Sequence, residues 1–214
     1  MKEYEPKNIF NADETGLFHE CLHDKTAMFK DEECRGGKQS KVRSTVLLAA
    51  NEDGSERLPP LTIGRSEKPR CFAKVKSFPF KYKANRKARM TSEIIEDWLN
   101  SFDRYMRVKK RKIIIFIDNC SAHSNLPALK NVSVKFFPAN TTSDLQPMDQ
   151  GKIRSFKVNY RRQTVRKLVD TIDEGSTLSK IDVLDCMRMT DYVWRDVSQK
   201  TAKNCFKKAG FKNV

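Results

Sequence analysis

The sequence predicts an α/β protein with a mixed five-stranded sheet flanked by helices. Three observations support this fold class: a short alternating strand near the N-terminus, a hairpin of two further strands, and a continuous apolar run after an amphipathic helix. Because a helix separates the hairpin from the apolar run, that run can lie parallel to the first strand and beside it. We therefore expect antiparallel and parallel strand pairs in one sheet, followed by a helical C-terminal extension.

The first strand is expected at residues 8–14 (NIFNADE). These residues alternate apolar and polar side chains, and the turn-prone pair Thr15-Gly16 follows them. The pattern places Asp13 near the C-terminal end of the strand.

The next two strands are expected at residues 42–50 and 58–63. They are joined by NEDGSER, in which Asp53-Gly54 is a strong hairpin signal. Two prolines at residues 59–60 place the later strand at an edge or make it irregular, because proline donates no ladder hydrogen bond.

Residues 64–89 form a strongly basic segment. Ten cations face a single acid, Glu67, and aromatic side chains interleave with the cations. This composition suits a surface that follows phosphates and touches sugars or bases. A solvated connection whose aromatic side chains pack into the core remains an equal alternative. The aromatic residues are Phe72, Phe78, Phe80 and Tyr82.

An amphipathic helix and two more strands come next. The pair Thr91-Ser92 can cap a helix whose apolar positions follow helical spacing to residue 106. Residues 113–118 (IIIFID) are typical of a central strand buried on both faces, with Asp118 at its end. A further short strand is expected at residues 132–137.

Beyond Gly151 the pattern is helical, with cations throughout residues 152–167 and no acid between them. Further helices are expected at about residues 180–198 and 201–209. We expect cations of the basic segment and of this first helix to bind DNA phosphates. They are Arg65, Lys68, Arg70, Lys74, Lys76, Lys152, Arg154, Lys157, Arg161 and Arg162.

The composition narrows the class of protein. The 214 residues include 42 Lys and Arg against 27 Asp and Glu, a formal net charge of +15, so a polyanion is the natural partner. No apolar stretch is long enough to span a bilayer, and the N-terminus lacks the apolar run of a signal peptide. The six cysteines occur singly, which favours reduced thiols over a zinc module or a disulfide framework.

Three carboxylates stand out by their context. Asp13 follows an apolar strand, Asp118 ends a buried strand, and Asp149 precedes the basic helix. Taken alone, Asp13 could be a solvated strand-end acid and Asp149 a helix N-cap. Asp118 is harder to dismiss, because a charge at the end of a buried strand is costly without compensation.

If the three acids converge, a divalent cation must neutralise them, since close carboxylates repel one another. Ligation by oxygen alone favours Mg²⁺ or Mn²⁺ over Zn²⁺. In a two-metal site, one ion activates the attacking water or 3′-hydroxyl and the other stabilises the leaving oxygen of a phosphodiester.

Four strings carry a resemblance to a known family: NADETGLF (residues 11–18), GGKQSKVRSTVLLAANEDGSERLPPLTIGRSEKPRCF (36–72), IDNCSAH (117–123) and NTTSDLQPMDQGKIRSFK (140–157). They resemble the DDE endonuclease domain of Tigger and pogo transposases, which jerky-type proteins and centromere protein B also carry. The likeness covers almost the whole chain, and the three acids match the family's Asp, Asp, Asp pattern.

The resemblance implies an RNase H-like DDE endonuclease domain at residues 1–175, with residues 176–214 as its helical extension. It implies a transposase domain that cuts and joins DNA with Mg²⁺, for which Mn²⁺ can substitute. Asp13, Asp118 and Asp149 would be the catalytic metal ligands. Asn119 and His123 match the signature after the second acid and would support the metal or the DNA; for His123 a purely local hydrogen-bonding role is an equal alternative.

Two nearby acids are not expected to bind metal. Glu14 should face the side of the strand opposite to Asp13, and Asp144 lies outside the matched pattern. Full-length family members carry N-terminal helix-turn-helix domains, whereas this sequence begins almost at the first catalytic strand. We therefore expect a piece of a longer protein or a domesticated descendant.

Three functions stay open on the sequence. The first is a metal-dependent DNA endonuclease and strand transferase; the second is a domesticated nuclear DNA-binding protein without catalysis; the third, weaker, is a nuclease of RNA or hybrids. DNA is the expected partner, a homodimer is a further candidate, and no membrane contact is expected. The family likeness and the basic run KKRK (residues 109–112) favour a nuclear location.

Overall fold

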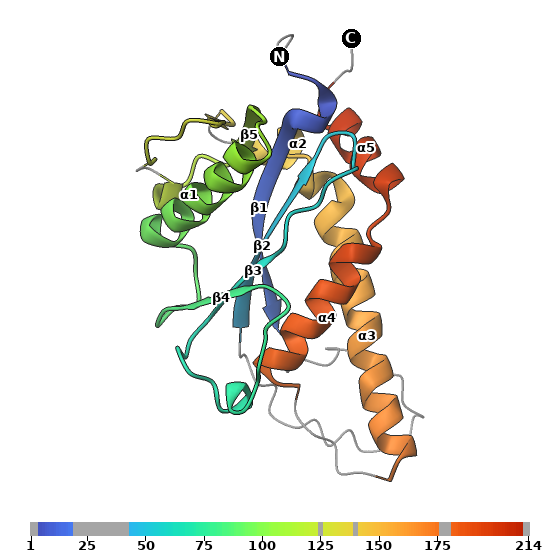
Figure 1. Ribbon diagram of the computed structural model, residues 1–214. Coiled ribbons are helices and arrows are strands. Elements are labelled where there is room, and N and C mark those ends of the chain that lie inside the picture. The colour runs from blue at the N-terminus through green and yellow to red at the C-terminus, as the bar shows by residue number, and fades with distance from the viewer. Residues whose placement is uncertain (1–3, 19–42, 124–125, 139–140, 176–180, 212–214) are drawn as a thin grey trace.

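A mixed six-stranded sheet forms the centre of the protein (Figure 1). The computed structural model describes residues 4–18, 43–123, 126–138, 141–175 and 181–211. The strands are β1 (Ile9–Phe18), β2 (Arg43–Asn51), β3 (Leu61–Gly64), β4 (Lys81–Ala84), β5 (Ile113–Ile117) and β6 (Val132–Phe136). Their order across the sheet is β4-β3-β2-β1-β5-β6. β1 pairs antiparallel with β2 and parallel with β5, so it joins the two halves of the sheet.

Helices cover both faces of the sheet (Figure 1). One face carries α1, and the other carries α3, α4 and α5. No helix among the described residues is both long and apolar enough to cross a membrane. The helices are α1 (Ser92–Val108), the short α2 (Thr142–Leu145), α3 (Ile153–Asp173), α4 (Val183–Asp196) and α5 (Gln199–Lys208). Tighter turns form η1 (Pro6–Asn8), η2 (Arg70–Phe72) and η3 (Ser121–His123), and a wider π-type turn, η4, spans Met148–Lys152.

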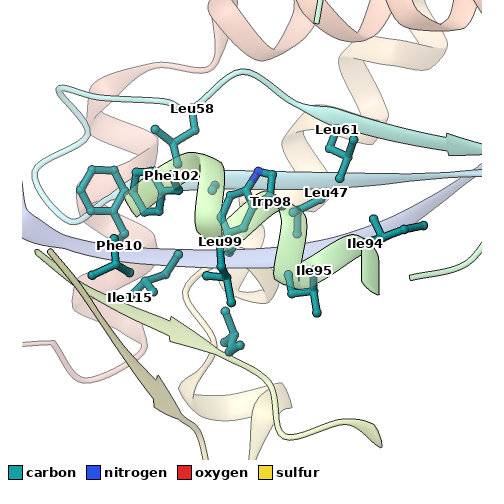
Figure 2. Packing of buried hydrophobic residues seen from close by; sticks show 14 of the residues in the cluster. Phe10, Leu47, Leu58, Leu61, Ile94, Ile95, Trp98, Leu99, Phe102 and Ile115 are labelled. Carbon is teal, nitrogen blue, oxygen red and sulfur yellow. The ribbon is translucent and has the colours of Figure 1, made fainter. Parts of the chain in front are cut away.

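The helix α1 forms where the sequence predicts it. The Thr91 side chain caps it by accepting a hydrogen bond from the Ile94 N–H at 3.4 Å. Its apolar face, which includes Trp98 and Phe102, packs on the sheet around Phe10 (Figure 2). Because α1 crosses this face, the chain returns as β5 parallel to β1.

The opposite face is covered by the C-terminal helices. Phe156 of α3 and Trp194 of α4 pack against Val46 and Leu48 of β2. The indole N–H of Trp194 also donates to the carbonyl of Leu58 at 2.9 Å. The C-terminal helices are therefore part of the packing that buries the sheet.

The predicted α/β fold class is confirmed, and three details need correction. The sheet has a sixth strand, β4, within the basic segment; it pairs with β3 through the backbone, and its polar sequence KYKA gives no hydrophobic signal. β1 continues to Phe18, so Asp13 lies inside this strand and not near its end. β3 lies inside the sheet, so its predicted edge position is wrong; the prolines at residues 59–60 instead leave the start of the expected strand irregular, and β3 begins at Leu61.

The cysteines within the described residues are free, as predicted. Cys21 and Cys34 lie outside these residues. The described thiols are those of Cys71, Cys120, Cys186 and Cys205.

Candidate metal centre and nucleic-acid interface

Two of the three predicted acids lie at the same level of neighbouring strands. The parallel pairing of β1 and β5 ends with Asn11 opposite Phe116. Asp13 and Asp118 each follow two residues later, Asp13 within β1 and Asp118 directly after β5. Both side chains are partly buried. The parallel register therefore brings together two acids that are far apart in the sequence.

The third acid, Asp149, lies in the turn η4 that leads into α3. Its backbone N–H donates to the carbonyl of Gln146 at 3.0 Å. The turn joins α3 through Gly151, whose φ of 135° is accessible to glycine and rarely to other residues. The carboxyl group of Asp149 shares a hydrogen bond with that of Asp13. The structure thus brings all three predicted acids together.

A buried amide, that of Asn11, ties together the three segments that carry these acids. Its Nδ2 donates to the carbonyl of Phe116 in β5 at 2.9 Å, and its Oδ1 accepts from the Met148 N–H in η4 at 2.8 Å. The side chain is fully buried, so water does not compete for these bonds. Asn11 therefore sets the position of η4, and with it Asp149, relative to β1 and β5.

The three acids create an unfavourable concentration of negative charge. Burial raises the pKa of Asp13 well above its usual range, and the charges of Asp149, Glu14 and Asp118 raise it further. Burial also raises the pKa of Asp149, against the opposing effects of its hydrogen bond with Asp13 and the charge of Lys157. Such a cluster needs a proton or a cation to be stable, and its all-oxygen donor set fits Mg²⁺ or Mn²⁺.

His123 connects the end of β5 to the other side of β1. Its Nδ1 lies 2.8 Å from Oδ1 of Asp118, and its Nε2 lies 3.1 Å from Oε1 of Glu14. Burial alone would lower the pKa of this imidazole, but the hydrogen bonds with Asp118 and Glu14 outweigh it and raise the pKa to about 11. The ring is therefore charged at neutral pH, donates from both nitrogens, and orients the Asp118 carboxylate.

A second group of metal-ligand atoms lies beside the acids. The donor atoms of Asp118, Cys120 and His123 are all within 4.8 Å of one another. Both His123 nitrogens already donate to carboxylates, and burial raises the pKa of the Cys120 thiol. Of these three residues, only Asp118 belongs to the predicted set of metal ligands.

Three further residues near the predicted acids do not belong to the cluster of carboxylates. Asn119, predicted as a supporting residue, is exposed. Asp144 is exposed in α2, as its solvated interpretation requires. Glu14 contacts His123, which agrees with the prediction that it faces away from Asp13.

The predicted DNA-binding cations of the basic segment are exposed, around η2 and the loop that follows it. The aromatic side chains beneath them contact one another: Phe72 lies 4.6 Å from Phe78 and 4.9 Å from Tyr82 between ring centroids. Phe80 is buried. The interpretation that these aromatics pack into the core is therefore correct for Phe80 alone: Phe72 and Tyr82 are partly buried, and Phe78 is 42% exposed. The exposed cations are Arg65, Lys68, Arg70, Lys74 and Lys76.

On α3, Arg154, Arg161 and Arg162 are exposed and Lys157 is partly buried. The prediction that Lys152 binds DNA is wrong, because its side chain is 0% exposed. Its Nζ lies 5.1 Å from the centre of the Trp194 ring and has no hydrogen-bond partner among the described residues. The turn η4 directs Lys152 into the interior, where α5 packs against it.

A known protein family matches most of the chain. A model described as "DDE superfamily endonuclease" matches residues 41–206. The chain belongs to this family. The match spans β2 to α5 and so includes the segments that carry Asp118 and Asp149.

Curated relatives of this DDE endonuclease domain extend over nearly the whole chain. Mouse Tigger transposable element-derived protein 4 is 39% identical over 215 residues, covering 100% of this chain and 41% of the relative. CENP-B homolog protein 2 of Schizosaccharomyces pombe is 33% identical, covering 97% and 42%. Human major centromere autoantigen B is 31% identical, covering 97% and 34%. The chain therefore spans less than half the length of these relatives.

A solved structure shows the same fold for the DDE domain. The crystal structure of the Mos1 mariner paired end complex with Mn has a TM-score of 0.50 at 12% identity, covering 100% of this chain and 59% of that chain. At this identity the likeness concerns the fold, and it confirms the predicted RNase H-like architecture.

The sequence predictions did not include Asn11, and they assigned no role to Glu14. Asn11 gives a weak signal: an amide in a strand whose neighbours Phe10 and Ala12 are apolar and buried. For Glu14, the alternation of the strand predicted the correct face, but the histidine that it meets comes from a distant turn.

Proposed function

We propose that this domain is a metal-dependent DNA endonuclease and strand transferase, with Asp13, Asp118 and Asp149 as its metal ligands. The main support for this proposal is the environment of the Asp13 carboxyl group. This group shares a hydrogen bond with Asp149 and lies close to Asp118, and burial and the neighbouring negative charges raise its pKa. Divalent cations relieve this repulsion and gain three carboxylate ligands.

The surrounding residues support catalysis in separate ways. When bound, Mg²⁺ or Mn²⁺ would activate the attacking water or 3′-hydroxyl and stabilise the leaving oxygen of the phosphodiester. Asn11 fixes the spacing of the three ligand-bearing segments. His123, charged and held by Glu14, keeps the Asp118 carboxylate in one orientation.

DNA is the proposed substrate. Exposed cations lie around η2 and on α3, and Lys157 is close enough to Asp149 to affect its pKa. A net charge of +15 favours a polyanion. Relatives are named for a transposable element and for centromeres, which both contain DNA. Because chromosomal DNA lies in the nucleus, we propose a nuclear location for the domain.

A second candidate function is DNA binding without catalysis. It is favoured by the relatives named major centromere autoantigen B and CENP-B homolog, whose names refer to a chromosomal structure and to no reaction. All three acids can persist in such a protein, because metal geometry also depends on residues around the ligands.

A plasmid-nicking assay tests the proposed function. Supercoiled DNA is incubated with wild type, Asp118→Asn and Asp144→Asn in Mg²⁺ or Mn²⁺, with EDTA as the metal-free control. We expect nicking by wild type and by Asp144→Asn, whose carboxyl is exposed outside the cluster. Asp118→Asn should abolish nicking and leave DNA affinity equal or slightly higher, because it removes one negative charge near the phosphates.

Nicking by Asp118→Asn would refute the assignment of the three acids. DNA binding without nicking by wild type would favour the second candidate. Parallel assays on matched RNA and hybrid duplexes separate the third candidate, because an RNA nuclease would cut these and spare DNA.

A further inference from the structure

One face of α3 carries four apolar side chains that are about half exposed. Val158, Val165, Val169 and Ile172 are 52%, 45%, 47% and 58% exposed. At about 100° per residue they lie within about 60° of one another around the helix axis. We call these four residues the α3 row.

The α3 row lies opposite the face by which α3 packs on the domain. That inner face carries Ile153, Phe156, Tyr160 and Thr164, which are all buried. The helix α4 lies on the inner side, where Lys167 forms an ion pair with Asp185. The row is therefore unnecessary for packing within the domain, and an aligned apolar row is less common on a surface than scattered apolar residues.

Charges beside the row change sign along the helix. Arg162 and Arg166 lie on one side of it, and Asp170 and Asp173 follow on the same side. All four are exposed, and none forms an ion pair with a described residue. This flank is therefore basic in its first half and acidic in its second.

We propose that the α3 row is a docking surface for a second copy of this chain, with the two α3 helices antiparallel. In such a pair the same flank of each helix faces its counterpart, so the arginines of one copy meet the aspartates of the other. Both ends of the contact are then complementary in charge, and the apolar rows bury each other. In a parallel pair this flank would instead face the opposite flank of the partner helix, so its arginines would not meet the partner's aspartates. A DNA strand would leave the apolar row against phosphates.

The proposal assigns Arg162 to the partner copy in place of DNA. Arg154 and Lys157, which lie closer in sequence to Asp149, remain in the proposed DNA surface.

Sedimentation equilibrium of the full chain tests the proposal. We expect a monomer–dimer equilibrium for wild type. Val165→Asp should weaken dimerisation by about a hundredfold, because it buries an unpaired carboxylate. Val108→Asp, at an 83% exposed valine on α1, is the matched control and should leave the equilibrium unchanged.

Charge variants test the antiparallel orientation. Arg162→Glu with Arg166→Glu makes the flank entirely acidic, and Asp170→Lys with Asp173→Lys makes it entirely basic. Each double variant should be monomeric alone, and the two should associate when mixed. The fourfold variant exchanges the signs and should dimerise as wild type does, because an antiparallel pair again aligns opposite charges.

Three results would overturn the proposal. The first is a monomeric wild type at every concentration tested. The second is a dimer insensitive to Val165→Asp. The third is an unchanged mass with lower DNA affinity for Val165→Asp, which would assign the row to DNA. Circular dichroism of each variant confirms that it is folded, as expected for substitutions at exposed positions.

Discussion

The amine of Lys152 is held inside the domain, one turn after Asp149. Burial lowers the pKa of Lys152 to about 7; the Cys205 thiol acts in the opposite direction and Arg57 adds to the decrease. The ring of Trp194 offers a cation–π contact at 5.1 Å as partial compensation. A charged Lys152 therefore reduces the stability of the fold.

The effect of Lys152 on stability depends on pH, because the pKa of its amine differs between the folded and the unfolded chain. An unfolded chain keeps the ordinary lysine pKa of 10.5, so between pH 7 and 10.5 it binds more protons at Lys152 than the folded chain does. The contribution of Lys152 to the free energy of unfolding therefore rises as pH increases through this window. Below it, both states are charged and the full cost of burial applies.

Lys152→Met should raise the free energy of unfolding near neutral pH by about 1–4 kcal/mol, because an apolar side chain of similar volume replaces a buried charge. The gain should shrink towards about pH 10, where wild-type Lys152 is largely neutral in the folded state. Urea denaturation at the two pH values measures both effects. Lys200→Met, at an exposed position on α5, should change stability little at either pH. Lower stability of Lys152→Met at both values would mean that the amine has a favourable partner in the fold.

At the scale of elements, Asn11 links β1, β5 and η4. Asn11→Ala would leave the Phe116 carbonyl and the Met148 N–H without these bonds, at a cost of about 1–3 kcal/mol for each buried group. We expect lower stability and also weaker Mn²⁺ binding, because η4 would lose its fixed distance from the strands. Chemical denaturation and Mn²⁺ titration by electron paramagnetic resonance measure the two effects.

Asn51 provides the matched control for this substitution. It is also a fully buried strand amide, but its side chain donates to Lys7 and Ser55 and accepts from the Glu56 N–H. None of these bonds reaches Asp13, Asp118 or Asp149. Asn51→Ala should therefore destabilise the fold without changing Mn²⁺ affinity. Equal loss of Mn²⁺ affinity in both variants would show that general destabilisation, and not positioning by Asn11, explains the result.

The sequence predicted correctly those helices, turns and strands that neighbouring residues specify. The cap of α1, the hairpin at Asp53-Gly54 and the apolar run of β5 are all present, since capping, turn geometry and burial act on neighbouring residues. β4 was missed because backbone pairing with β3 stabilises it.

In the candidate site, too, the residues with local sequence signals were predicted, and those that depend on distant partners were not. The three acids were predicted from strand ends and a motif, and the structure brings them together. Lys152 was misplaced because its burial depends on Trp194 and α5, which local helical periodicity does not include. Asn11 was missed because its partners are 105 and 137 residues away.

At the scale of the whole molecule, excess positive charge surrounds a small acidic centre. We expect DNA affinity to fall by about a thousandfold or more between roughly 50 and 200 mM salt, provided that about six or more phosphates are contacted. Fluorescence anisotropy with labelled DNA across a salt series measures this slope. Replacing Arg65, Lys68 and Arg70 by alanine should reduce the slope by about three, whereas Lys152→Ala should leave it unchanged because Lys152 is buried. Affinity independent of salt would contradict an electrostatic interface.

The acids at positions 13, 118 and 149 also constrain when this centre can form. During synthesis the first acid leaves the ribosome long before the third, and the amide that aligns them has bonds spanning 105 and 137 residues. The cation site therefore has a high contact order and is completed late in folding. A nascent or partly folded chain presents only separate carboxylates, so divalent cations bound as proposed would stabilise the finished fold and not its precursors.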